Sequence, residues 1–263
     1  MPPVRFLLPA LVAVTWTAAA AAQGAAGGMA RIPAGSYVPL YVAAGTPEVR
    51  VAAFRLDRYA VTRGEYLAFV RSNPKWRRDS VKAVFAGEGY LADWPAALDA
   101  GTPTDRARPA TGVSWFAARA YCASTGKRLP TTDEWEYAGR ASEHSRDASH
   151  DPAFMSRLIT LNTAGAAERA LPRRGFRNAY GVHGMHGGPW EWTDDFNSVL
   201  VSADSREAGG TGRHTDFRAV CASAAIGASD PSNYAAFLRH AFRAALDARS
   251  TIGMLGFRCA ASA

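Results

Sequence analysis

Residues 126–138 read GKRLPTTDEWEYA and carry clear signals for where helices stop and start. The Thr131 hydroxyl can cap a helix while Glu134, three residues later, reaches back to the Thr131 backbone in a capping box. The helix predicted from this point turns Trp135 inward. Gly126 can adopt the left-handed conformation that ends a preceding helix. The segment therefore predicts two helices joined by a tight connection.

Three further helices are expected on either side of this segment. One begins at Ser114, and another begins at Thr62, with Glu65 completing a second capping box, and ends before Pro74. The last follows Asp230, because the next residue is a proline in the first helical position. Their apolar stripes are Trp115, Ala118 and Cys122; Tyr66, Phe69 and Val70; and Tyr234, Phe237, Ala241 and Ala245.

Strands are expected at residues 31–37, 49–56 and 256–259, where apolar residues lie between glycine and proline signals. Residues 74–110 and 141–180 are expected to be long irregular segments. The 24 Gly, 15 Pro and 7 Trp of the chain indicate a loop-rich fold braced by aromatic packing. Long helical bundles and doubly wound sheets do not suit this composition.

The 263 residues are 48% hydrophobic and 20% charged, a composition that excludes disordered and fibrous chains. The formal net charge is +7, but scattered arginines supply most of the positive charge. Since no run of lysines forms a basic tail, we expect no nucleic-acid partner.

The first residues have the three-part layout of a secretory signal. Arg5 precedes an apolar run at 6–17, which small alanines and then Gln23 follow. The alternative is a single membrane anchor, but the run is short for the roughly 20 residues of a span. We therefore expect a signal peptide at 1–22, a tether at 23–30 and one domain at 31–263, without a membrane span after cleavage. The expected location is the periplasm or the exterior, where disulfides persist.

Five sequence blocks occur in a fixed order along the chain, and together they resemble the sulfatase-modifying-factor, or formylglycine-generating-enzyme, domain. The resemblance implies an irregular α+β fold similar to a C-type lectin, with low regular secondary structure. It also implies a disulfide between Cys122 and Cys259. The blocks are residues 61–70, 113–122, 126–138, 190–193 and 255–260.

The family resembled here contains several activities, among them copper-dependent oxidation of a sulfatase cysteine to formylglycine, iron-dependent chemistry and members without demonstrated catalysis. In the formylglycine enzymes two cysteines, three and eight residues after a serine, bind copper(I). Ser223 matches that serine, but the thiol positions fall on Ile226 and Pro231, which offer no ligand to a soft ion. Copper(I) at a paired-thiol site is therefore not expected. Cys221, the odd thiol, is open to a reactive role, an intermolecular bond or simple burial.

The resemblance also implies a calcium site, with an asparagine and a glutamate of one segment as ligands. Glu191 matches the glutamate, whereas Gly188 replaces the asparagine and offers no side-chain oxygen. Calcium at Glu191 stays an expectation. His183 and His186 could share a metal ion, although their Gly-rich surroundings favour an ordinary loop.

A substrate or partner groove is expected near the second half of the chain. Two interpretations stay open for Trp190 and Trp192, which either belong to the core or line the groove. Arg239 and Arg243 of the last helix either clamp a carboxylate of the ligand or form a solvated helix face. The weak catalytic candidates are Cys221 and Ser223. The groove candidates are Trp190, Trp192, Asp230, Tyr234, Arg239 and Arg243.

These features predict an exported, formylglycine-generating-enzyme-like protein that lacks the copper cysteines. The predicted function is a binding or maturation accessory that holds a peptide or protein partner, such as a periplasmic (metallo)enzyme. The segment from Cys221 to Arg243 resembles a branch of the family that is accessory to copper nitrite reductases. The alternative is an iron-dependent or single-thiol oxidoreductase acting on a peptide or small molecule.

Overall fold

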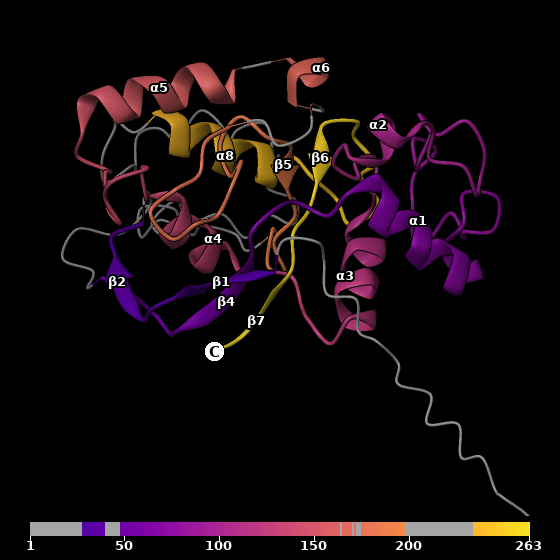
Figure 1. Ribbon diagram of the computed structural model, residues 1–263, viewed down its shortest axis with the longest axis horizontal. Coiled ribbons are helices and arrows are strands. Elements are labelled where there is room, and N and C mark those ends of the chain that lie inside the picture. The colour runs from indigo at the N-terminus through magenta and orange to yellow at the C-terminus, as the bar shows by residue number, and fades with distance from the viewer. Residues whose placement is uncertain (1–27, 40–47, 164, 170, 172–174, 198–233) are drawn as a thin grey trace, which may run out of the picture.

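The computed structural model describes residues 28–39, 48–163, 165–169, 171, 175–197 and 234–263. Short helices and strands alternate with long turns, so the fold is α+β with low regular secondary structure, as predicted (Figure 1). The elements are β1 Met29–Ile32, β2 Gly35–Tyr37, β3 Val49–Val51, β4 Phe54–Asp57, α1 Arg63–Ser72, the 3-10 helix η1 Pro74–Trp76, α2 Pro103–Arg106, α3 Trp115–Ser124, α4 Thr132–Gly139, α5 Pro152–Asn162, α6 Ala166–Arg169, β5 Trp190–Glu191, α8 Tyr234–Ala244, β6 Leu255–Gly256 and β7 Ala260–Ser262.

The strands bring the two ends of the domain together. The antiparallel strands β1, β4 and β7 form one sheet, in which Leu56 of β4 pairs with Ala30 on one side and Ala260 on the other. Strands β2 and β3 form an antiparallel pair, whereas β5 and β6 are parallel. The predicted strand at 256–259 is wrong in its bounds, because the backbone leaves β6 after Gly256 and joins β4 only from Ala260.

The predicted helix signals are confirmed in the first half of the domain. Thr62 and Glu65 form a capping box at the start of α1, and Thr131 and Glu134 form one at the start of α4. Gly126 follows α3 with φ +71°, a left-handed conformation that glycine adopts without strain. Within the described ranges, no helix has both the length and the apolar character needed to cross a bilayer.

The expectation of an irregular segment at 141–180 is wrong, because helix α5 lies within it. The Asp151 side chain caps α5 by accepting from the backbone N–H groups of Ala153 and Phe154. Phe154 and Leu158 then form the buried stripe of this helix. An aspartate before a proline and an apolar pair at i and i+4 are ordinary helix signals, which the surrounding polar and small residues obscure.

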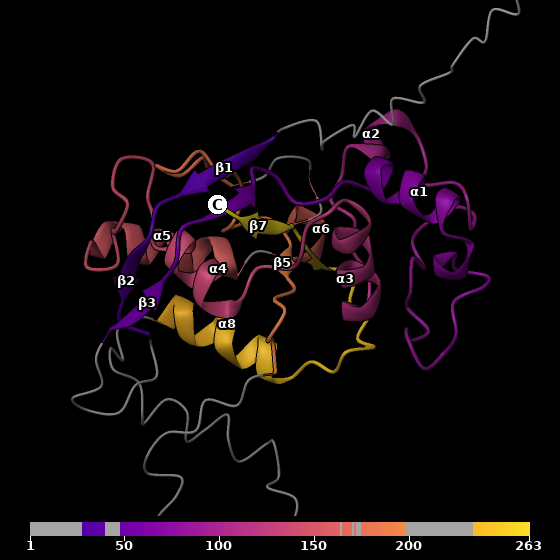
Figure 2. The same ribbon diagram turned by 90° about the horizontal axis from the view of Figure 1, so that it is seen from below.

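Helix α4 lies between the strands and α8, and α8 packs beside α5 (Figures 1 and 2). One buried core surrounds Tyr66, whose ring contacts those of Tyr121 and Phe257. The disulfide between Cys122 and Cys259 lies in this core and joins α3 to the C-terminal segment. A second core fills the space between the strands and α4.

Candidate functional site

Glu191 of β5 is held by protein donors. Its Oε1 accepts a hydrogen bond of 2.8 Å from Arg258 Nη2, and its Oε2 accepts from Arg258 Nε at 2.7 Å and from Trp135 Nε1 at 2.8 Å. The Glu191 and Arg258 side chains are fully buried. The same guanidinium donates to the carbonyls of Asp57 and His183. Glu191 and Arg258 therefore tie β5 to the sheet and to α4.

This arrangement does not suit Glu191 as a calcium ligand. Calcium takes six to eight oxygens, and both oxygens of Glu191 are engaged while a guanidinium lies against them. A buried carboxylate needs a cation or hydrogen-bond donors to offset its desolvation, and Arg258 and Trp135 supply both for Glu191.

The two tryptophans that flank Glu191 differ in their surroundings. Trp192 is fully buried in the larger core, and its indole N–H donates to the carbonyl of Val113 at 2.8 Å. Trp190 is half-buried between the guanidinium of Arg169, 4.5 Å from its ring, and the ring of Phe242, whose centroid is 4.7 Å away. Trp192 is thus a core residue, and Trp190 retains an exposed part beside α8.

Arg239 and Arg243 form a buried ionic cluster with Glu136 of α4. Arg239 Nε donates to both carboxylate oxygens of Glu136, at 3.1 Å to Oε1 and 3.2 Å to Oε2, and Arg239 Nη2 donates to Oε2 at 2.7 Å. Arg243 Nη1 donates to Glu136 Oε1 at 2.6 Å. Both guanidiniums also lie over the ring of Trp135, at 5.5 and 4.9 Å. The interpretation of these arginines as a solvated helix face is wrong, since only 6–7% of each side chain is exposed.

The cluster of Glu136, Arg239 and Arg243 holds one negative and two positive groups. Burial disfavours the charged carboxylate, but the two guanidiniums outweigh it and hold the pKa of Glu136 well below its usual range. Burial also lowers the pKa of the neighbouring His240 to about 4. Arg239 Nη1 is buried and has no hydrogen-bond partner among the described residues. The cluster therefore orients α8 against α4 through charges that are fixed at neutral pH.

His183 and His186 do not converge on a common site. His183 stacks on Tyr59 at 4.6 Å, whereas His186 is buried and its Nε2 lies 2.7 Å from the carbonyl of Gly139. A carbonyl accepts only, so we assign the ring proton to Nε2. Burial lowers the pKa of His186 to about 3. No group of three potential metal-ligating side chains lies together in the described ranges.

The remaining predicted site residues divide between the surface and the part of the chain outside the described residues. Tyr234, at the start of α8, is 47% exposed. Cys221, Ser223 and Asp230 lie outside the described residues, as do the copper positions at 226 and 231. Of the catalytic and groove candidates, the structure thus gives surroundings for Trp190, Trp192, Tyr234, Arg239 and Arg243.

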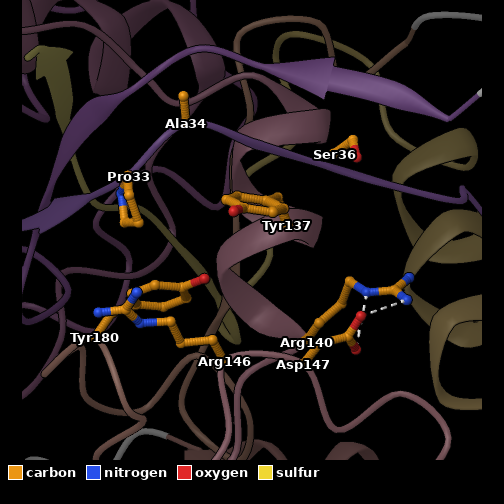
Figure 3. Close-up of a pocket in the computed structure, with 8 residues that line it drawn as sticks. All are labelled: Pro33, Ala34, Ser36, Tyr137, Arg140, Arg146, Asp147 and Tyr180. Carbon is orange, nitrogen blue, oxygen red and sulfur yellow. Dashed lines mark hydrogen bonds and ion pairs between the residues drawn. The ribbon is translucent and has the colours of Figure 1, made fainter.

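A pocket of about 260 Å³ opens beside α4, on residues that we had not predicted (Figure 3). Tyr137 lies in its middle, below the turn between β1 and β2. On one side Arg146 lies over the ring of Tyr180, and on the other Arg140 pairs with Asp147. The full lining is Pro33, Ala34, Ser36, Tyr137, Arg140, Arg146, Asp147 and Tyr180.

Sequence reasoning missed Glu136, the carboxylate that pairs with the two arginines. It stands in the segment 126–138 that showed the family resemblance, where a charged residue inside a short helix reads as solvent-exposed. Its partners are 103 and 107 positions away, so no local pattern connects them. The signal that could have found Glu136 is the pair of arginines one helical turn apart, because two buried guanidiniums need a nearby carboxylate.

Comparison with known proteins shows that a family model, the sulfatase-modifying factor enzyme 1-like domain, matches residues 16–263. The formylglycine-generating enzyme of Streptomyces coelicolor is 29% identical, over 95% of this chain and 96% of its own. The inactive C-alpha-formylglycine-generating enzyme 2 of Bos taurus is 28% identical, over 82% of this chain and 79% of its own.

A relative of another kind is the hercynine oxygenase of Mycobacterium tuberculosis, which is 30% identical over 55% of this chain and 38% of its own length. Among solved structures, PvdO from Pseudomonas aeruginosa aligns with a TM-score of 0.48 and 21% identity, over 89% of this chain and 94% of its own.

Proposed function

Because the chain belongs to the sulfatase-modifying factor enzyme 1-like domain family, we propose that it is a binding or maturation accessory without formylglycine chemistry of its own. In this proposal the first 22 residues direct export, and the domain acts in the periplasm or outside the cell. Its partner is an extended peptide or a protein, with a periplasmic metalloenzyme as the favoured class.

The observation that carries this proposal is the state of the cysteines. The chain has three, and Cys122 and Cys259 are bonded to each other in the larger core. Cys221 is then the single remaining thiol, whereas a linear copper(I) site needs two soft ligands. A relative that is named inactive, and that aligns over 79% of its own length, is consistent with a loss of chemistry in the family.

The buried charges near Trp190 also favour binding over catalysis. Glu191 and Glu136 both have low-exposure arginine partners, so neither is available as a general base. Two aromatic side chains of the described residues keep exposed area, namely the half-buried Trp190 of β5 and Tyr234 at the start of α8. Aromatic side chains of this kind provide large contact areas for a peptide at little entropic cost.

The experiment incubates the purified mature chain with copper(I), oxygen and a sulfatase-type cysteine peptide, and follows peptide mass and fluorescence anisotropy. We expect the peptide mass to remain unchanged. Catalytic loss of the thiol with formation of an aldehyde would overturn the proposal. The binding arm compares the wild type with Tyr234→Ala, and we expect the variant to bind more weakly.

The second candidate function is an iron-dependent or single-thiol oxidoreductase, which the partial match to a hercynine oxygenase favours. Metal analysis of the purified chain separates the two functions. Stoichiometric iron supports the oxidoreductase, and Cys221→Ser distinguishes a thiol-dependent reaction from an iron-dependent one.

A further inference from the structure

We propose that the pocket beside α4 binds a small aromatic carboxylate, such as the C-terminal residue of a peptide that ends in an aromatic side chain. The pocket is lined by the eight residues of Figure 3. This inference does not rest on the proposed function, because it uses neither the cysteines nor α8.

The pocket offers a flat ring one aromatic side, although most of its accessible lining is polar. The rings of Tyr137 and Tyr180 lie 6.4 Å apart with an interplanar angle of 38°, and Pro33 and Ala34 close the opposite side. The volume of about 260 Å³ is just below the range of drug-sized sites. A ring that carries a short polar chain is therefore the size of ligand that this pocket favours.

The charges of the lining favour an anion. Arg140 and Asp147 neutralise each other through bonds of 3.1 and 3.3 Å, and Arg140 also donates to Ser149 Oγ and to the carbonyl of Val38. Arg146 remains, which gives the lining a net charge of +1. Asp147 is further engaged by the backbone N–H of Ser149. A carboxylate on the ligand would balance the charge that the pocket leaves uncompensated.

Arg146 is placed to receive that carboxylate. Its guanidinium carbon lies 5.7 Å from the centroid of the Tyr180 ring, a cation–π contact, and no carboxylate lies within salt-bridge distance among the described residues. A stacked guanidinium keeps the N–H groups on its edge free for a carboxylate. Burial, reinforced by the Tyr137 side chain, raises the pKa of Tyr180, so its hydroxyl stays protonated at neutral pH.

Gly35 is not part of the lining, but its backbone lies close against the Tyr137 side chain that is. It lies in β2 directly over Tyr137, and a Cβ atom at this position would overlap the Tyr137 hydroxyl. Gly35→Ala therefore moves the aromatic wall without changing any charge. This variant and a variant of Arg146 test the apolar and the ionic parts of the site separately.

The experiment titrates the mature chain with N-acetylphenylalanine and, separately, with N-acetylphenylalaninamide, which lacks the carboxylate, and measures dissociation constants by NMR. We expect the acid to bind about tenfold more tightly, the lower end of what charge-assisted hydrogen bonds give, because Arg146 is exposed. Arg146→Gln should remove this preference and leave binding of the amide unchanged. Gly35→Ala should weaken both ligands and preserve their ratio.

The matched control is Arg157→Gln, because Arg157 pairs with Glu143 and lies over Phe176 outside the pocket lining. We expect it to bind both ligands like the wild type. Equal affinity for acid and amide, or an acid preference that survives in Arg146→Gln, would overturn the proposal. Absence of binding of either ligand to the folded wild type at tens of millimolar would do the same. None of these outcomes bears on peptide conversion, so this proposal and the proposed function fail separately.

Discussion

Glu136→Gln should destabilise the domain strongly, since it removes the only negative charge from a buried cluster of three. The Glu136 side chain is 6% exposed and accepts four hydrogen bonds of 2.6–3.2 Å from Arg239 and Arg243. Removing one partner of a buried ion pair costs about 3–5 kcal/mol, because the remaining charge loses its compensation. Here two guanidiniums lose it, which places the expected cost toward the upper end of that range. For a domain of this size each kcal/mol lowers the melting temperature by about 2–4 °C, which gives a decrease of roughly 6–20 °C.

The assay is chemical denaturation at neutral pH, with melting curves in parallel. Glu143→Gln is the control, because its pair with Arg157 at 2.7 Å is half-exposed and should contribute at most about 1 kcal/mol. Glu136→Gln combined with Arg243→Gln should cost less than the sum of the single changes, since the second change removes a cation that the first has left unpaired. A loss no larger than that of the control, or strict additivity in the double variant, would refute the assigned role of Glu136.

Three further outcomes are expected. Glu191→Gln leaves the buried guanidinium of Arg258 unpaired, so it should lower the free energy of unfolding by about 3–5 kcal/mol. The decrease should be the same with and without a calcium chelator, and an unchanged denaturation midpoint would contradict this prediction. As pH falls from about 6.5, the unfolded chain takes up protons at His186 and at His240 that the folded state resists until about pH 3 and pH 4, so each histidine should lower stability by about 1.4 kcal/mol per pH unit in its window; His186→Gln should remove one of these two contributions, and equal slopes of variant and wild type between pH 4 and 6.5 would count against the assignment. Non-reducing peptide mapping should find Cys122 linked to Cys259, and reduction should cost about 5 kcal/mol by the loop-entropy relation for their separation of 137 residues; Cys221 linked to either one would be the opposing result.

The elements that sequence alone predicted well are those whose signals are local. Each capping box needs a Thr and a Glu three residues apart, and both predicted boxes form at the starts of α1 and α4. Gly126 ends α3 for a reason that lies in its own backbone. Helix α5 carried equally local signals at Asp151, but the polar composition of the whole segment outweighed them in the prediction.

The site was harder to predict, because its contacts join distant parts of the chain. Trp190 and Glu191 could be singled out from one short segment, but the partner of Glu191 is Arg258, 67 positions later. The pocket beside α4 is lined by the connection between β1 and β2, by residues within 137–147 and by Tyr180, so no single sequence motif contains it. The arginines of α8 illustrate the limit, since their spacing is equally compatible with a solvated face and with a buried ion cluster.

Trp135 connects the two buried carboxylates and explains why α8 is held firmly in place. Its indole N–H donates to Glu191 on β5, while the guanidiniums of Arg239 and Arg243 lie over its ring. Displacing α8 would therefore uncover two cations and separate them from Glu136 as well as from Trp135, and both changes are costly in a buried site. The inner face of α8 is thus anchored by charges that persist at neutral pH. A rigid surface binds a partner with little loss of conformational entropy. A helix anchored in this way suits the binding role proposed above, because that role needs a preformed surface.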